Sequence, residues 1–216
     1  MKQCIVYCLC AFLVVSCMVG TTRGGGAVKS ENRSLEGFNE IAIHGSTDAF
    51  ISKSPEYQVE LKAYENLLPE LETSVRNSVL SVGYKPNSSI HNDNSELFVN
   101  VPELVGVSMN GSGNINISGN FTTQNFTASM SGSGNINLPE GQIENLKVEI
   151  NGSGELDGHQ FKAHNAEVTI KGSGEVRVYV TGHLNIKIEG SGDVYYIGDP
   201  REVTTDVSGS GKVIKE

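Results

Sequence analysis

Residues 109–117 read Met-Asn-Gly-Ser-Gly-Asn-Ile-Asn-Ile, and residues 130–137 repeat almost the same letters as Met-Ser-Gly-Ser-Gly-Asn-Ile-Asn. The tripeptide Gly-Ser-Gly occurs six times in the 216-residue chain, and successive copies begin 18 to 21 residues apart. The glycines of these copies are Gly111, Gly113, Gly132, Gly134, Gly152, Gly154, Gly172, Gly174, Gly190, Gly192, Gly209 and Gly211. A fixed period of this length is the mark of a repeat architecture.

Apolar residues flank every copy at alternate positions. Two residues before each copy stand Met109, Met130, Ile150, Ile170, Ile188 and Val207. Four residues after its first glycine stand Ile115, Ile136, Leu156, Val176, Val194 and Val213. This alternation predicts a strand with one buried face on each side of a glycine corner. A period near 20 residues is too short for a pair of helices, so the pattern predicts a β-solenoid whose parallel coils stack about 4.8 Å apart.

The corners themselves have a physical reason for their composition. Glycine adopts a positive φ and allows two backbones to approach closely. The central serines of successive corners predict a ladder of hydroxyl groups along one edge of the stack. The chain has no Trp, which fits a narrow coil interior filled by Val, Ile, Leu and Met.

Residues 35–106 lack the tripeptide but continue the pattern in a less regular form. The stretch from Ile41 to Ile51 resembles strand, corner and strand, with Thr47 in place of the second glycine. We therefore expect residues 35–106 to form irregular opening coils and residues 107–216 to form the regular repeats of one solenoid domain. The sequence of residues 66–72 predicts a turn, or a single helical turn, between two strands.

The N-terminus has the features of a targeting segment. Lys2 precedes the apolar run of residues 5–15, which is long enough for a signal peptide and too short to span a bilayer. All four cysteines lie within residues 4–17, and Val14-Val15-Ser16-Cys17 is typical of a bacterial lipobox. This predicts a signal peptide over residues 1–16, a lipidated Cys17 and a flexible tether over residues 17–34. Ordinary secretion with cleavage elsewhere, or a buried N-terminal helix, are the alternatives.

Composition excludes several other classes of protein. The formal net charge is −9 and the chain has no basic block, which argues against nucleic acid as a partner. A hydrophobic content of 38% is too high for a disordered chain. The glycines do not fall at every third residue, as collagen requires.

One column of residues directly after the corners contains the acidic side chains Glu155, Glu175 and Asp193. If the coils stack in register, these carboxylates lie about 4.8 Å apart, and a hard cation such as Ca²⁺ would bridge them through oxygen atoms. The alternative is a solvated acidic edge without a metal. The five histidines have no spacing typical of a metal site, and the sequence predicts no cofactor.

The ordered set of motifs resembles the auto-transporter adhesin head GIN domain family. The segments that carry the resemblance are Leu35–Phe38, the stretch Ile41–Ser52, Glu65–Pro69, the Gly-Ser-Gly corners, Val178–Thr181 and Gly190–Pro200. The two copies of Gly-Ser-Gly-Asn-Ile-Asn belong to the same pattern. The resemblance covers about residues 35–216 and implies a right-handed parallel β-helix on an exported, often lipid-anchored protein. It implies no catalytic residues.

These observations favour a non-enzymatic adhesin-like or structural module of the cell envelope. We expect an outer-membrane lipoprotein, on the periplasmic face or the cell surface, that is anchored through Cys17 and contacts glycans or envelope proteins. Because the last coil carries Val213 and Ile214 without a cap after them, we also expect a covering loop or self-association. The alternative function is a carbohydrate-active enzyme, a polysaccharide lyase or hydrolase, that uses Asp157, Lys171, Glu175 and Arg177.

Overall fold

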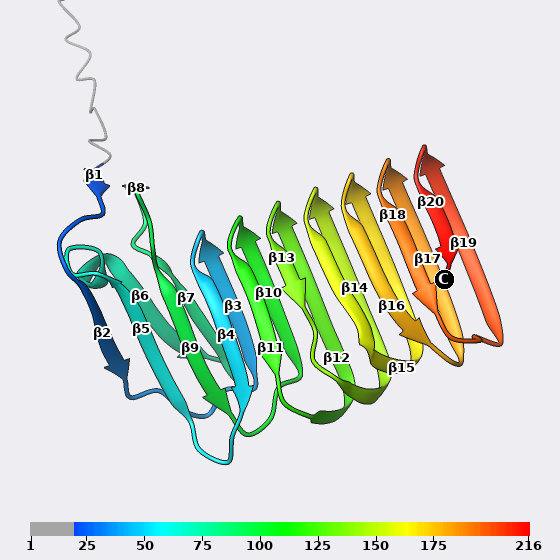
Figure 1. Cartoon of the computed structure of the whole chain (residues 1–216), viewed down its shortest axis with the longest axis horizontal. Coiled ribbons are helices and arrows are strands. Elements are labelled where there is room, and N and C mark those ends of the chain that lie inside the picture. Colours follow the sequence, from blue (N-terminus) through cyan, green and yellow to red (C-terminus); the bar gives the residue numbers. More distant parts are fainter. Residues whose placement is uncertain (1–19) are drawn as a thin grey trace, which may run out of the picture.

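The computed structural model describes residues 20–216, which form a single stack of β-coils (Figure 1). The predicted signal peptide and the lipidation site at Cys17 lie outside the described residues. No helix within residues 20–216 is long and apolar enough to cross a membrane. The β-solenoid predicted from the repeat is confirmed.

Two long sheets make up the two sides of the stack. The pre-corner sheet holds the strands that lead into each corner, and the post-corner sheet holds the strands that leave it. In spatial order the pre-corner sheet contains β6 (Leu71–Arg76), β7 (Val79–Tyr84), β3 (Glu40–Gly45), β10 (Gly106–Gly111), β12 (Phe121–Gly132), β14 (Gly141–Gly152), β15 (Glu155–Gly172), β17 (His183–Gly190) and β19 (Glu202–Gly209). The post-corner sheet contains β2 (Val28–Arg33), β5 (Gln58–Tyr64), β9 (Glu96–Val101), β4 (Asp48–Lys53), β11 (Asn114–Ser118), β13 (Asn135–Asn137), the first residues of β15, β16 (Glu175–Val180), β18 (Asp193–Ile197) and β20 (Lys212–Lys215).

Each corner is held to the corner of the preceding coil by its backbone. The N–H of Ser133 donates to the carbonyl oxygen of Gly111 at 3.1 Å, and the N–H of Ser153 donates to that of Gly132 at 2.9 Å. The other corners repeat this contact. Gly132 has a φ of +140°, and a Cβ atom there would overlap the carbonyl oxygen of Gly111. The corners are therefore glycine because a neighbouring carbonyl fills the space of a side chain.

The predicted ladder of serine hydroxyls is not what joins the corners. Among the described residues no side-chain hydrogen bond links one corner serine to the next, and the serine N–H groups make the contact instead. A backbone amide is fixed in place by the turn, whereas a hydroxyl on an exposed side chain has free rotation and competes with water.

The interior is built from columns of identical or similar side chains. Met130, Ile150, Ile170 and Ile188 form one column, and each is at most 1% exposed. The predicted columns before and after the corners are confirmed by the strand register. The expectation of a narrow interior is wrong for the return side of the coils. There Phe121, Phe126 and Phe161 are fully buried, and the Phe126 and Phe161 rings meet edge to face at 5.4 Å between centroids.

The opening segment is less simple than a run of coils. The coil of β3 and β4 lies in the middle of the stack's N-terminal region, between the coil of β7 and β9 and the coil of β10 and β11 (Figure 1). Beyond β7 and β9 the strands β6, β5 and β2 run antiparallel and close this end. The short 3-10 helix Leu68–Glu70 lies between β5 and β6, where a helical turn was predicted.

The upstream corner at Gly45 is confirmed. Asp93, which lies outside the repeat pattern, holds this corner through hydrogen bonds. Asp93 accepts hydrogen bonds from the hydroxyls of Ser46 at 2.6 Å and Tyr84 at 2.5 Å. Burial and this hydrogen bond raise the pKa of the Tyr84 phenol well above its usual value. Beside them the buried Thr47 and Ser95 hydroxyls bond to each other at 2.7 Å, so the polar groups of the irregular corner are satisfied internally.

The flexible tether predicted over residues 17–34 is wrong for most of that range. β1 (Gly20–Arg23) pairs in parallel with β8 (Ser88–His91), and β2 pairs antiparallel with β5. Backbone pairing orders these residues although their side chains are polar and exposed, because an edge strand needs only one hydrogen-bonded neighbour. The folded domain therefore begins at residue 20 at the latest.

Replacing Gly132 by Ala tests the corner contact. The new methyl group would displace the Gly111 carbonyl and hold a non-glycine residue at positive φ, so we expect a loss of about 2–3 kcal/mol in the free energy of unfolding. Ser133→Ala is the matched control, because it keeps the backbone N–H, and we expect it to cost less than about 0.5 kcal/mol. Chemical denaturation measures both, and equal stability of the two variants would contradict the account of the corner.

Candidate functional site

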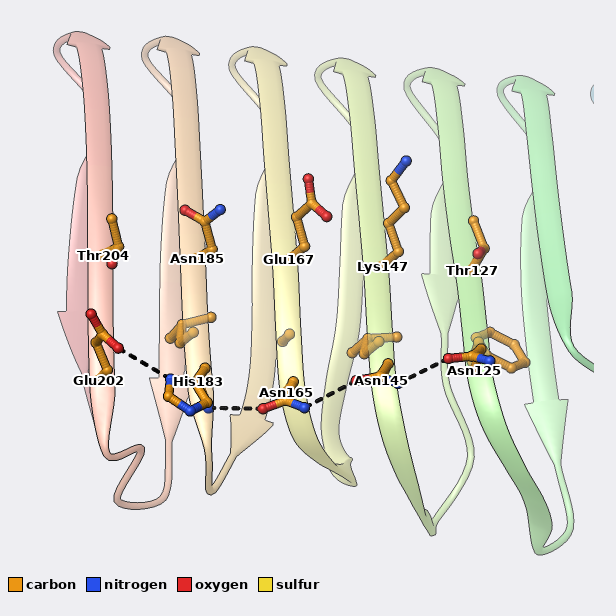
Figure 2. A pocket seen from close by; sticks show the side chains of 14 residues that line it. Asn125, Thr127, Asn145, Lys147, Asn165, Glu167, His183, Asn185, Glu202 and Thr204 are labelled. Atoms are coloured by element: carbon orange, nitrogen blue, oxygen red, sulfur yellow. Dashed lines mark hydrogen bonds and ion pairs between the residues drawn. The ribbon is translucent and has the colours of Figure 1, made fainter.

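A trough lies on the outer face of the pre-corner sheet and crosses β12, β14, β15, β17 and β19 (Figure 2). It has a volume of about 610 Å³. Two rows of outward side chains line it. The first row is Asn125, Asn145, Asn165, His183 and Glu202, and the second row is Thr127, Lys147, Glu167, Asn185 and Thr204.

The first row is a continuous hydrogen-bonded ladder. The side-chain amide of Asn145 donates to Asn125 at 2.9 Å, and that of Asn165 donates to Asn145 at 3.0 Å. The Asn165 oxygen then accepts the backbone N–H of His183 at 3.2 Å, and the His183 ring Nδ1 lies 3.2 Å from Glu202 (Figure 2). An Asn amide has two N–H donors and two acceptor positions. The ladder uses one of each at Asn145, which leaves one donor and one acceptor for a ligand.

The second row gives the trough its charge. Lys147 and Glu167 are paired neighbours in the sheet register and carry opposite charges on exposed side chains. A hydrogen bond from Lys147 to Glu149 at 2.8 Å, together with the carboxylate charge, raises the pKa of the lysine. Lys147 therefore places its positive charge next to two carboxylates, that of Glu149 on its own strand and that of Glu167 on the next strand.

Sequence reasoning did not identify this trough, although a signal for it exists. Asn125, Asn145 and Asn165 recur at the 20-residue period of the corners. The period alone places the three asparagines in one row. It does not show that the sheet forms a trough there, because the trough depends on how each coil bends into its pre-corner strand.

The acidic column is in register as predicted, but its members already have partners. Glu155 pairs with Glu175, and Glu175 pairs with Asp193, in neighbouring coils. The Arg177 guanidinium contacts both Glu155 and Glu175, and Asp193 accepts the backbone N–H of Lys212 at 2.8 Å. Across residues 20–216 no three His, Cys, Asp or Glu side chains are grouped closely enough to hold a metal ion. A bound cation would have to displace Arg177.

Three of the four residues considered for an enzyme lie together on one sheet, and the fourth lies on the other. Asp157, Glu175 and Arg177 belong to the post-corner sheet, whereas Lys171 lies on the pre-corner sheet beside Asn151. Partial burial favours the neutral form of Asp157, but hydrogen bonds from His159 and the charge of Arg177 outweigh it and lower the pKa of this carboxyl group. Asp157 is therefore an ionised, hydrogen-bonded group, and such a group is a poor general acid at neutral pH.

Comparison with known proteins gives one family and a set of similar folds. The family model described as "Putative auto-transporter adhesin, head GIN domain" matches residues 37–200. None of the curated proteins compared with the chain matches it. A crystal structure titled as a putative adhesin from Bacteroides fragilis NCTC 9343 is similar, with a TM-score of 0.76 and 17% identity over 90% of this chain and 100% of that chain.

Two further solved structures share the fold. One is titled as a putative lipid binding protein from Parabacteroides distasonis ATCC 8503, with a TM-score of 0.64 and 24% identity over 91% of this chain and 99% of that chain. The other is titled as a putative adhesin from Parabacteroides merdae ATCC 43184, with a TM-score of 0.53 and 22% identity over 91% and 99% of the two chains. At these identities the likeness concerns the fold alone.

Arg177→Gln tests the role of the guanidinium in the acidic column. At pH 7 the change leaves Glu155 and Glu175 facing each other without a cation, so we expect the melting temperature to fall by about 2–4 °C. Near pH 3, where carboxyl groups are largely protonated, the difference from the unmodified protein should shrink. Lys187→Gln, which loses an exposed pair with Glu189 on the other sheet, is the control and should shift little. A pH-independent effect of Arg177→Gln would contradict the electrostatic account.

Proposed function

This chain belongs to the auto-transporter adhesin head GIN domain family, and from that premise we propose that it is an adhesin-like binding module of the cell envelope that holds an extended glycan along the trough of the pre-corner sheet. The family and the similar folds are named as adhesins or lipid-binding proteins, which is in keeping with binding and not with catalysis. Of the four groups considered for an enzyme, Lys171 lies apart from the other three, and Asp157 is an ionised carboxylate that is a poor general acid at neutral pH, so the enzyme alternative is not favoured.

The observation that carries the proposal is that asparagine side chains repeat along the trough at the spacing of the coils. Asn125, Asn145 and Asn165 follow each other at about 4.8 Å, the distance between strands. Each of these side chains retains hydrogen-bonding capacity toward solvent. A linear glycan presents hydroxyl groups at similar regular intervals, so successive sugar units would meet equivalent amides along the row. The charged pair of Lys147 and Glu167 would then discriminate between neutral and charged units.

The proposed site of action is the cell envelope, with Cys17 as the lipid anchor. Two residues separate Cys17 from the first residue of β1 at Gly20. Because β1 is paired with β8, a lipid on Cys17 would hold the N-terminal end of the solenoid close to the membrane and leave the trough at the far end of the domain. Several acyl chains would provide the firm attachment that this arrangement needs.

Cys17→Ser tests the anchor in cells. We expect the variant to lose incorporation of labelled fatty acid and to move from the membrane fraction to the soluble fraction, because no other residue of the proposed mature chain carries a thiol. Ser16→Ala keeps a small residue before the cysteine and should remain anchored. Continued fatty-acid labelling of Cys17→Ser would rule out this residue as the lipid site.

Asn145→Ala tests the trough on a glycan array. The variant loses the central amide of the ladder, and we expect the signal of any bound glycan to fall by about tenfold, as for the loss of one or two hydrogen bonds. Asn114→Ala is the matched control, since Asn114 is the middle of a similar ladder between Asp48 and Asn135 on the post-corner sheet. An equal loss in both variants, or binding only to protein ligands, would place the binding surface elsewhere.

A further inference from the structure

A second concave surface, which we name the return groove, lies where each chain passes from a post-corner strand to the next pre-corner strand. It shares no lining residue with the trough. Two hollows of about 950 and 680 Å³ form it, and Gln142, Lys162 and Tyr179 line both of them. In the strand register Thr122, Gln142, Lys162 and Tyr179 follow one another from coil to coil. The groove therefore runs along the stack and presents one polar side chain from each of four coils.

A break in the strand pairing shapes the wall of the return groove. Gly158 and Lys162 of β15 pair with two consecutive residues of β16, so residues 159–161 have no partner in that strand. Two side chains of this bulge, His159 and Gln160, are exposed and line the groove. A β-bulge re-aims side chains, and bulges are frequent next to active sites for this reason. The bulge thus adds two polar groups to the groove that a regular coil would not place there.

The imidazole ring of His159 is held in a fixed orientation. Its Nδ1 lies 2.6 Å from the carboxylate of Asp157, and its backbone N–H donates to the same oxygen at 3.2 Å. Because an ionised carboxylate only accepts hydrogen bonds, Nδ1 is the donor. The other ring nitrogen, Nε2, is then left for a ligand.

Lys162 brings an uncompensated positive charge to the middle of the return groove. Its ammonium group lies 5.3 Å from the centroid of the Tyr179 ring. Within residues 20–216 it forms no ion pair, whereas Lys147 and Lys187 of the pre-corner sheet each pair with a glutamate. An aromatic ring attracts a cation but does not neutralise its charge. The ammonium group therefore keeps both its charge and its hydrogen-bond donors for an anion.

We propose that the return groove binds an acidic glycan, with the carboxylate of one sugar unit on Lys162 and a neutral unit beside Gln142. One ammonium group matches one carboxylate through charge-assisted hydrogen bonds. Glu140 and Glu144 are exposed on either side of Gln142 in the preceding coil, and they repel a second carboxylate at that place. Amide groups such as that of Gln160 suit the hydroxyls of the sugar rings. This site is separate from the trough and does not depend on a glycan being held there.

A pair of matched probes tests the proposal by calorimetric titration of the purified protein. One probe is a tetrasaccharide of alternating glucuronic acid and N-acetylglucosamine, and the other is its methyl ester, which has no charge. We expect the acid form to bind at least tenfold more tightly than the ester. Lys162→Gln should weaken binding of the acid form about tenfold, as for the loss of a hydrogen bond to a charged group, and leave binding of the ester unchanged.

Two further substitutions separate charge recognition from contact with the sugar. Lys162→Arg keeps the charge and should retain most of the preference for the acid form. His159→Gln should weaken binding of the acid form and of the ester by the same factor, because it removes a contact to the sugar ring and not to its charge. An arginine variant as weak as Lys162→Gln would contradict the role of the charge.

Lys171→Gln is the matched control, since it removes the same charge farther along β15, on the pre-corner sheet. It should bind both probes like the unmodified protein. Asn145→Ala in the trough should also leave binding of the acid form unchanged, so that failure of this site and failure of the trough give different results. Equal binding of the acid form and the ester, no binding of the acid form, or a loss in Asn145→Ala that Lys162→Gln does not show would each overturn the proposal.

Discussion

The whole structure depends on how closely one corner approaches the next. The first glycine of each corner offers its carbonyl oxygen to the serine N–H of the following coil, in the space that a Cβ atom would need. This contact leaves no freedom in the offset between coils, because any shift would either break the hydrogen bond or drive the carbonyl into the neighbouring backbone. In the strands next to a corner each residue is therefore placed above its equivalent in the coil before, and the register shifts only farther away, as between Gly158 and Lys162.

The core and the surface follow from that single alignment. On the inward side of the strands the alignment stacks branched aliphatic side chains, such as Ile150 on Ile170. The stack thereby builds a continuous core, although a single coil is too small to have a core of its own. On the outward side the same alignment produces rows of equivalent polar groups, such as Asn145 and Asn165. The inward and outward side chains of a strand are thus both repeated from coil to coil by the same translation along the stack. The inward positions must be apolar to fill the core, whereas the outward positions have no such requirement, and the first row changes along the stack from Asn to His183 and Glu202.

This constraint explains which features were predictable from the sequence. Corners, inward columns and the acidic column repeat with the translation, so spacing alone located them, including the altered copy at Gly45. Features that occur only once could not be found from a period. These are the capping strands β5 and β6, the pairing of β1 with β8 and the partners of Asp93. Arg177 belongs to neither group. Its position was visible, but its choice of Glu155 and Glu175 depends on side-chain reach across two coils, which spacing does not determine.

A stack related by translation has no internal reason to stop. Each added coil presents the same edge that the previous one presented, so termination requires a strand that departs from the translation. At the N-terminal end the chain provides this by reversing direction, and the antiparallel β5 and β6 accept the free edge without offering the same edge again. At the other end β19 keeps the parallel direction and register of β17, and its edge is thus chemically equivalent to an interior one.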